Sequence, residues 1–387
     1  MIERKPSIFG GIFVQRSAGL GAKGGHAYYI VWTRCSMGSM NGSHALSTEE
    51  VRACPLCGSA DKEVLFMGLR DRFFGVPGEW AYKRCRRCTL IFLDPRPTRE
   101  DIGKAYTVYS THALVALPDN LPRRLRSYVR GGYLANKFGY GTGANRLQRL
   151  AGWLAYLHPG QREYMNGSIM YLPASRRGRV LDVGCGAGEA LDELRRLGWE
   201  VEGVDPDPEA AANAVRNRGL KVRVGTLEDQ SYPPDHFDAV VLSHTIEHVH
   251  DPVSLLRECR RVLRPGSLLV VATPNTESVG SCHFGPDWRV LEPPRHLTLF
   301  SRKTLSQAAR AAGLSLLELR TTVRGADGVF TESRELRAVR TAGESLIKHK
   351  HAPVLERLKG HAYQYVVSMA LWALPNAGEE LLMVATK

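Results

Sequence analysis

The chain has 387 residues, enough for two domains and a sizeable core, and 43% of them are hydrophobic, which excludes a wholly disordered protein. Eight cysteines include two C-x-x-C pairs, a usage typical of a zinc site in a reducing compartment and not of a disulfide scaffold. The net charge of +13 indicates an acidic surface or ligand, and no run reaches the ~20 apolar residues that span a bilayer, so we expect a cytoplasmic protein.

Residues 1–46 are rich in glycine and serine and show no hydrophobic period, so we expect a disordered N-terminal extension. The next stretch, 47–100, holds the two C-x-x-C pairs, separated by 27 residues. Four thiolates in two such turns suit tetrahedral Zn²⁺, which takes sulfur ligands. We predict a zinc-ribbon-like module with a structural zinc ion on Cys54, Cys57, Cys85 and Cys88.

Residues 101–177 read as a basic, mainly helical connector. Between 121 and 180 there are eleven Lys or Arg residues against the single acid Glu163. This basic segment predicts peripheral contact with an anionic membrane surface, at the inner face of the membrane, or with an acidic substrate; a solvated helical face is the alternative. The stretch 146–157, "RLQRLAGWLAYL", has apolar residues at helical spacing, and we expect this stripe to pack on the neighbouring domain.

From residue 178 to the end, strand and helix patterns alternate. Strand patterns cover 179–184, 200–205, 221–225, 237–243 and 268–275, with helices at 189–198, 208–219 and 252–266. Asp251 and Pro252 read as the N-cap and first residue of the last of these helices. Two more strands, 314–322 and 379–387, flank a basic helical insertion at about 326–376. The fold class is therefore α/β, with a Rossmann-like, seven-stranded, doubly wound sheet.

The turn "LDVGCGAGEA", 181–190, is the most informative stretch. Its glycines allow a sharp bend and a close approach to a ligand. Asp182 precedes them, and Glu189 opens the helix where a diphosphate would otherwise bind, so a cationic ligand suits the turn better. Asp205 ends the second strand, where an acid accepts hydrogen bonds from ribose hydroxyls.

These residues, with "FDAVVLSHTIEHVHDPVSLLRECRRVLRPG" and "VVATPNTESVG", resemble class I S-adenosylmethionine-dependent methyltransferases, particularly bacterial proteins associated with cell-surface polysaccharides and secondary metabolites. The resemblance covers about 178–322 and implies S-adenosyl-L-methionine as cofactor. The cysteine module is also similar to that of some sugar C-methyltransferases, although their long C-terminal domain is missing here. The expected cofactor-binding residues are Asp182, Gly184, Cys185, Gly186, Gly188, Asp205, Pro206, Leu227, Glu228 and Ser243.

The stretch "SHTIEHVHD", 243–251, follows the fourth strand and faces the ligand crevice. A hydroxyl acceptor needs a base near neutral pH, and we predict His244, then His248, for this role. His244, Glu247 and His248 could instead hold a divalent metal if helical, as the resemblance to metal-assisted ubiquinone-pathway O-methyltransferases implies, or serve as caps. His250 is expected at the surface.

A lid is predicted at 284–300, "FGPDWRVLEPPRHLTLF". There Trp288 would form an apolar wall, and Arg289 and Arg295 would bind a carboxylate or phosphate of the acceptor. His296 is a third catalytic candidate, with a purely structural hydrogen bond as its alternative.

The predicted function is methyl transfer from S-adenosyl-L-methionine to a small-molecule or sugar-containing acceptor, at oxygen. The rival is a zinc-ribbon protein that binds nucleic acid or a membrane and uses the methyltransferase fold as a scaffold. The intact cofactor loop favours the enzyme, and the basic segment lacks the interleaved aromatics of a single-strand binder, which argues against a nucleic-acid partner.

Overall fold

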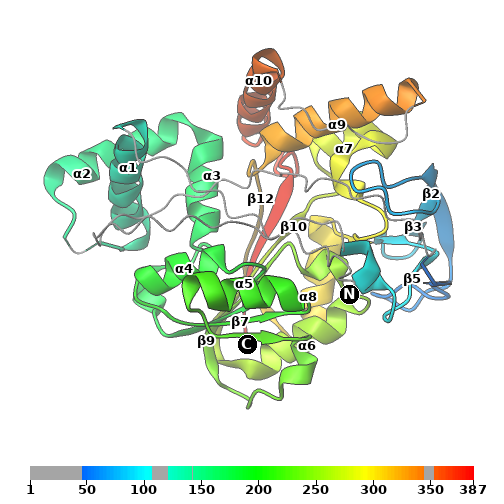
Figure 1. Ribbon diagram of the computed structural model, residues 1–387, viewed down its shortest axis with the longest axis horizontal. Coiled ribbons are helices and arrows are strands. Elements are labelled where there is room, and N and C mark those ends of the chain that lie inside the picture. The colour runs from blue at the N-terminus through cyan, green and yellow to red at the C-terminus, as the bar shows by residue number, and fades with distance from the viewer. Residues whose placement is uncertain (1–45, 107–120, 142, 344–352) are drawn as a thin grey trace, which may run out of the picture.

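The structure is a computed structural model that describes residues 46–106, 121–141, 143–343 and 353–387 (Figure 1). The disorder prediction for 1–46 falls, up to residue 45, outside these ranges.

A seven-stranded mixed sheet forms the centre of the molecule, as predicted. Its strand order is β12-β13-β10-β9-β6-β7-β8, with β13 antiparallel to both neighbours. The strands are β6 (Arg179–Val183), β7 (Glu200–Asp205), β8 (Val222–Val224), β9 (Phe237–Ser243), β10 (Leu263–Pro274), β12 (Ser315–Thr322) and β13 (Glu380–Thr386).

Alternate residues of the central strands pack on opposite faces of the sheet, because side chains alternate along a strand. Leu181, Val240 and Val271 share a core with α6 (Pro252–Val262) and α8 (Arg302–Ala311). Val180 and Val241 share another with α4 (Glu189–Arg196) and α1 (Leu121–Phe138). α5 (Pro208–Arg218) packs beside β7 and β8. Both faces are thus covered, as a doubly wound sheet requires.

The predicted helix start at Asp251 is confirmed. Its side chain accepts a hydrogen bond from Ser254 N at 2.9 Å, and Pro252 follows as the first helical residue. Asp207 and Pro208 repeat this arrangement at the start of α5, which fixes the direction in which the chain leaves β7.

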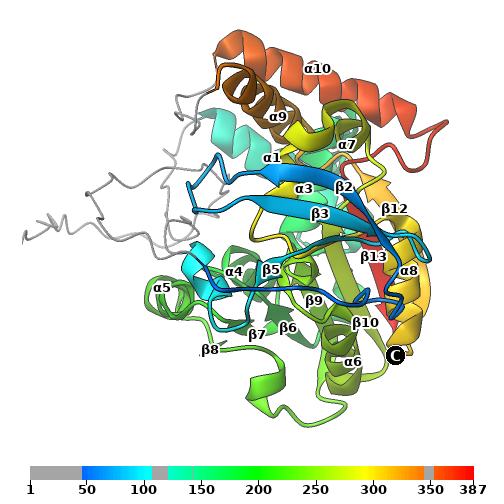
Figure 2. The ribbon, with the colours of Figure 1, turned by 90° about the vertical axis from the view of Figure 1, so that its right-hand side faces the viewer.

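The cysteine-containing stretch forms β1 (Thr48–Glu49), β2 (Lys62–Leu69), β3 (Trp80–Cys85), β4 (Ile91–Leu93) and β5 (Arg96–Pro97). Its sheet is completed by a strand from the far end of the chain, since β11 (Thr298–Leu299) pairs with β4. Figure 2 shows β2 and β3 against the methyltransferase-like part. Trp80 and Leu93 pack with Trp288 and Leu297 in one core, so the cysteine module and the lid form one unit.

The connector contains η1 (Ile102–Tyr106), α1, α2 (Arg146–Ala151), η2 (Gly152–Leu157), α3 (Pro159–Ser168) and η3 (Ala174–Arg176). The prediction that the 146–157 stripe packs on a neighbour is wrong. Gly152 and Ala155 form the buried side of η2, and a Cβ on Gly152 would lie 2.4 Å from Gly132 C. Because this close backbone crossing needs the small residues inside, the large apolar side chains point outward.

Along the chain, β12 and β13 are separated by two helices, α9 (Ala326–Thr341) and α10 (Val354–Ala370), in the stretch predicted as a helical insertion (Figure 1). The remaining elements precede α8: α7 (Val279–Phe284), η6 (Gly285–Asp287), η7 (Arg289–Leu291) and β11; η4 (Glu228–Gln230) and η5 (Ile246–His248) flank β9. Among the described residues, no helix is both long and apolar enough to cross a membrane.

Candidate active site

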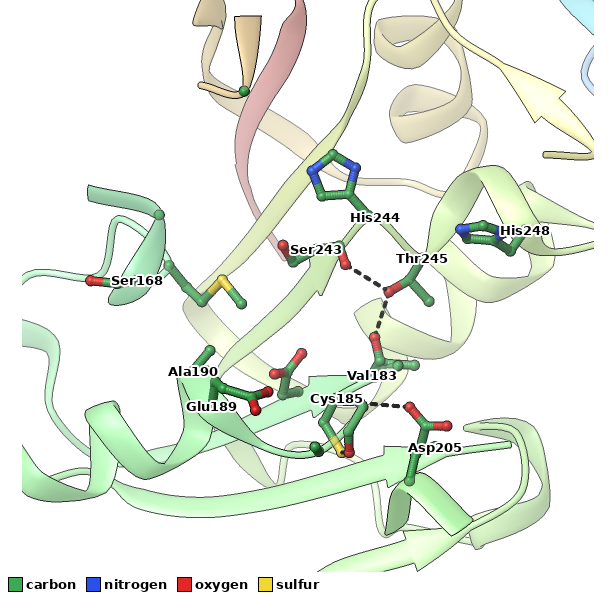
Figure 3. A pocket seen from close by; sticks show the side chains of 18 of the residues that line it. Ser168, Val183, Cys185, Glu189, Ala190, Asp205, Ser243, His244, Thr245 and His248 are labelled. Carbon is green, nitrogen blue, oxygen red and sulfur yellow. Dashed lines mark hydrogen bonds between the residues drawn. The ribbon is translucent and has the colours of Figure 1, made fainter. Parts of the chain in front are cut away.

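A cavity of about 2450 Å³ lies at the carboxyl ends of the central parallel strands. All but one of the predicted cofactor-binding residues line it, as do the three predicted catalytic histidines. The exception is Gly188, where a Cβ would lie 2.4 Å from Leu220 Cδ1, so this glycine permits close packing of α4. Figure 3 shows how β6, β7 and β9 direct residues into the cavity.

Two glycines of the turn after β6 have different roles. Gly184 has a φ of +78°, and a Cβ there would lie 2.6 Å from Thr245 Oγ1, so only glycine lets the turn pass under Thr245. Gly186 has a φ of +54° and no atom within 4 Å of a would-be Cβ. Gly186 therefore leaves open space at the backbone, as a close ligand approach requires.

Asp182 is buried and its Oδ1 atom has no hydrogen-bond partner. Burial, and then the charges of Asp205 and Glu189, raise the pKa of the Asp182 carboxyl to about 7. A buried, unpaired carboxylate beside two other carboxylates costs free energy unless a cation balances its charge. The ammonium and sulfonium groups of S-adenosylmethionine supply such positive charge, so the residues fit this cofactor.

Asp205 holds the glycine turn as well as facing the cavity. Its Oδ2 accepts a hydrogen bond from Gly186 N at 2.7 Å (Figure 3), and its Oδ1 accepts one from Asp207 N at 2.9 Å. The adjoining Pro206, and Leu227 and Glu228 beyond β8, line the same part of the cavity. Asp205 therefore connects the glycine turn with the part of the cavity where we predict the ribose of the cofactor.

The chain turns sharply after Ser243. His244 has a φ of +54°, an uncommon conformation for a residue with a side chain, and the following turn is the 3-10 helix η5. His244 and His248 consequently lie on either side of Thr245 (Figure 3). His244, Glu247 and His248 would share one face only if this segment were an α-helix, and it is not.

Both ring nitrogens of His244 bind carboxylates. Nδ1 lies 3.2 Å from Glu247 Oε1, and Nε2 lies 3.1 Å from Glu380 Oε2. Burial alone would lower the pKa of His244, but these two acids outweigh it and raise the pKa to about 9. His244 is therefore an imidazolium at neutral pH, with both N–H groups donated to protein acids.

The rings of His248 and His296 pack edge to face, with their centroids 4.7 Å apart. His296 Nδ1 donates to Val290 O at 2.6 Å, which leaves Nε2 as the acceptor of a neutral ring. Burial, and then the charge of His248, lower the pKa of His296 to about 4, so it stays neutral at pH 7. His248 Nδ1 lies 2.8 Å from Tyr106 Oη and 3.1 Å from Arg295 O.

One carboxylate joins this pair. Ligand atoms of Glu247, His248 and His296 all lie within 4.8 Å of one another, close enough to hold a metal ion. His296 thus takes the place that the sequence suggested for His244 in a three-residue metal set. Glu247 also accepts a hydrogen bond from Thr273 Oγ1 at 2.9 Å, and its pKa is about 2 because His244 outweighs the effect of burial.

Both lid arginines are paired with protein carboxylates, and of the two only Arg289 lines the cavity. Arg295 is fully buried and pairs with Asp71 at 2.9 Å and Glu292 at 3.0 Å, while Arg289 pairs with Glu332 at 2.7 Å. Their predicted role in gripping a substrate anion is not supported, since protein carboxylates already occupy them. Trp288 is buried in the core shared with the cysteine module, and it does not line the cavity.

His250 is buried, so its predicted surface position is wrong. Its Nε2 donates to Pro97 O at 2.9 Å, and Arg96 Nη1 donates to His250 O at 2.9 Å. These contacts attach the end of the histidine-rich stretch to the cysteine module.

The four cysteines of the module converge. Their sulfur atoms lie within 4.8 Å of one another, with Cys54 and Cys88 at 3.5 Å and Cys57 and Cys85 at 3.6 Å. Zn–S bonds of ~2.3 Å in a tetrahedron would place sulfurs roughly 3.8 Å apart, so the cluster fits zinc. The first turn has Gly58 at a φ of +69°, and Thr89 adopts a φ of 72° at the same place in the second.

Three further cavity residues escaped the sequence analysis: Tyr106, Arg324 and Glu380. Arg324 Nη1 lies 3.2 Å from Glu380 Oε2, so Glu380 links this guanidinium to His244. Glu380 begins the last strand, 136 residues after His244. No local signal marks such a partner, although two adjacent acids, Glu379 and Glu380, stand at the start of an otherwise apolar strand.

Residues 156–319 match the family described as "Methyltransferase domain". A ubiquinone biosynthesis O-methyltransferase of Methylocella silvestris is 34% identical over 160 residues, 38% of this chain and 62% of that protein. One from Bradyrhizobium sp. is 41% identical over 102 residues, 25% of this chain and 40% of that protein. The chain thus spans less than two thirds of these relatives.

A solved structure from Thermotoga maritima, described as a methyltransferase and possible histamine N-methyltransferase, is 22% identical, with a TM-score of 0.39 over 62% of this chain and 96% of that one. The family match coincides with the strands and turns that line the cavity. Residues 156–319 are therefore similar to a methyltransferase domain, and they include the glycine turn and the strand ends that line the cavity.

Proposed function

We propose that this protein transfers the methyl group of S-adenosylmethionine to a hydroxyl oxygen of a small, largely apolar molecule. The observation that carries the proposal is the unpaired carboxylate of Asp182, buried beside the glycine turn in the cavity that also contains His248 and His296. One end of the cavity is suited to a cationic methyl donor, and the other offers a neutral imidazole for the proton.

Asp182, Glu189 and Asp205 would hold the cofactor, with Gly186 providing room at the backbone. When bound, S-adenosylmethionine supplies a methyl group on a positively charged sulfur, ready for attack by a nucleophile. The protein must then place the acceptor oxygen in line with that group and exclude water. Positioning of this kind contributes much of the catalysis in bimolecular transfer.

Proton removal is assigned to the His248–His296 pair. His296 presents a free Nε2 atom, fixed by its Nδ1 hydrogen bond to Val290 O. His244, the first candidate from the sequence, has both nitrogens bonded to acids, and we propose that as an imidazolium it orients Glu247 and Glu380. The acceptor hydroxyl would pass its proton to a ring nitrogen as the new C–O bond forms.

Apolar side chains in the walls of the cavity favour an apolar acceptor. Leu125, Val129, Leu154, Met165 and Met170 line it. The relatives are named for ubiquinone biosynthesis, and a ring-bound hydroxyl would suit both these walls and a histidine base. A sugar-containing acceptor and a role in polysaccharide pathways stay predictions without support from these contacts.

The four-cysteine cluster would hold a structural zinc ion. Burial favours the neutral thiol of Cys54 and raises its pKa. A bound dication would lower that pKa and favour the thiolate. The ion would hold the module against the lid through the pairing of β4 with β11.

The Glu247, His248 and His296 set also suits a divalent cation, which would bind the acceptor oxygen in place of a free base. A chelator distinguishes a histidine base from a metal site. Methyl transfer would continue after metal removal if a histidine is the base, and it would stop if a metal ion is needed.

Transfer from S-adenosylmethionine with a labelled methyl group, offered to phenols, catechols and simple sugars, tests the function. The proposal expects a methyl ether on a phenolic or catechol oxygen, lost in Asp182→Asn and reduced in His296→Ala. Methylation at nitrogen or carbon, or of sugars alone, would contradict it.

A further inference from the structure

The connector presents a row of large apolar side chains to solvent. Leu147, Leu150, Trp153, Leu154 and Leu157 are 70%, 68%, 61%, 54% and 72% exposed. They point outward because Gly152 and Ala155 occupy the buried side of the segment. Single exposed leucines are ordinary, but a row of this size on two consecutive short helices, α2 and η2, marks an interaction surface.

A second row lies along α10 and the turn after it. Leu355, Leu358, Val366, Met369 and Trp372 are 61%, 58%, 57%, 64% and 93% exposed. Their spacing places them along one side of the helix, while Gly360, Gln364 and Val367 lie on the buried side. This helix is therefore apolar on the side that faces away from the protein.

The two rows adjoin. Tyr365 Oη of α10 donates a hydrogen bond to Leu157 O at 2.9 Å, and the rings of Tyr365 and His158 lie 5.5 Å apart. We call the combined surface, formed by 146–157 and the outer side of α10 with Trp372, the apolar face. α10 projects from the edge of the molecule in Figures 1 and 2, where a flat partner can reach it.

The charge around the apolar face has one dominant sign. Residues 121–157 contain seven Lys or Arg and no Asp or Glu. Arg146 and Arg149 are exposed on the same short helix as Leu147 and Leu150, and Arg124 and Arg126 are exposed on α1. Apolar side chains between arginines are the pattern by which a protein lies on an anionic lipid surface.

We propose that the apolar face binds the surface of an anionic phospholipid membrane. A second copy of the chain fits less well, because pairing two such faces would bring their arginines together. A nucleic acid would neutralise the arginines but leave the leucines and Trp372 in water. A bilayer satisfies both, since headgroup charge meets the arginines and the apolar side chains enter the acyl boundary.

The apolar face borders the cavity. Leu154 belongs to the face and also lines the cavity, and Leu125 lines it from α1. An apolar acceptor dissolved in the bilayer would therefore reach the site beside Leu154. This consequence rests on the proposed function, whereas membrane binding does not.

Co-sedimentation of the full chain with vesicles tests the proposal. Vesicles of equal parts phosphatidylglycerol and phosphatidylcholine should bind the protein, and phosphatidylcholine vesicles should bind it at least about tenfold more weakly. The double variant Arg146→Glu/Arg149→Glu and, separately, Trp153→Ser/Trp372→Ser should each lower binding to anionic vesicles about tenfold or more.

Matched controls change two exposed arginines and one exposed apolar residue elsewhere. Arg216→Glu/Arg310→Glu and Met67→Ser alter exposed positions away from the face and should leave vesicle binding unchanged. Retained S-adenosylhomocysteine binding would show that the face variants are folded, and it separates this proposal from the function. The membrane proposal would be overturned if the wild type did not bind anionic vesicles, or if the control variants lost as much binding as the face variants. It would also be overturned if the protein formed a dimer that the face variants abolish, or if it bound RNA tightly without binding vesicles.

Discussion

The imidazole of His244 hydrogen-bonds through Nε2 to Glu380 Oε2 at 3.1 Å, which joins the turn after β9 to the start of β13. Glu247 binds the other nitrogen, so a positively charged ring bridges two buried acids. The His244 side chain itself is 44% exposed to the cavity. Because the bridge needs the charged ring, it stabilises the folded protein less at alkaline pH.

The pKa of His244 is raised to about 9 in the folded protein, above the ~6.5 of an unfolded chain. A raised pKa adds stability that is fully present below pH ~6.5 and is lost as the pH rises through about 9. The free energy of unfolding should therefore fall between these limits more steeply in the wild type than in His244→Asn. Urea unfolding at a series of pH values measures this, and parallel curves for the two proteins would contradict the bridge.

Asp182 predicts pH-dependent cofactor binding. Because its pKa is about 7 in the empty site, a growing fraction is protonated as the pH falls, and an ammonium ligand must displace that proton. Affinity for S-adenosylhomocysteine should increase from pH 6 to pH 8 with proton release, measured by calorimetry in buffers of different ionisation enthalpy.

In Asp182→Asn the affinity should drop by roughly tenfold to a hundredfold, the loss expected for a hydrogen bond to a charged group. The pH dependence should vanish with it. Glu200→Gln, at the exposed start of β7, is the control and should bind as the wild type does. An unchanged pH profile in Asp182→Asn would assign the proton to another group.

The cysteine cluster predicts one bound zinc ion per chain. Cys85→Ser should lose the metal and lower the melting temperature by several degrees, because the cluster supports the sheet that includes β11. Elemental analysis and thermal unfolding check this. Cys282→Ser removes an exposed thiol outside the cluster and should change neither; zinc-free wild-type protein with normal stability would count against the site.

The crossing of Gly132 and Gly152 predicts a packing defect. A Cβ on Gly132 would lie 1.8 Å from Gln148 O, so Gly132→Ala must push α2 and η2 away from α1. We expect a loss of at least about 2 kcal/mol in the free energy of unfolding. Gly328→Ala, which has nothing within 4 Å in α9, should be neutral or slightly stabilising. Equal effects would show that the crossing is not tight.

The sequence predicted those parts of the structure that depend on neighbours along the chain. Asp251 and Pro252 cap their helix because the cap needs only the next three residues. The glycine turn and Asp205 likewise fall where local patterns place them, at consecutive strand ends. These signals sufficed for the sheet and for the cofactor side of the cavity.

The side chains outside the cofactor part of the cavity are held by partners that lie far away in the sequence, so local patterns could not predict their positions. Arg295 binds Asp71, 224 residues away, and so cannot grip a substrate anion. The stripe at 146–157 had a helical period, but periodicity does not say which side is covered. There the small residues Gly152 and Ala155 took the buried side, which left Trp153 in solvent.

Calorimetric titration with S-adenosylhomocysteine, on the wild type and on Asp205→Ala, measures whether the cavity binds this cofactor. We predict binding in the micromolar range with one site per chain, abolished in the variant because Asp205 both holds the Gly186 turn and faces the cavity. No binding by the folded wild-type protein would contradict it and would favour a scaffold that has kept the methyltransferase fold without its cofactor.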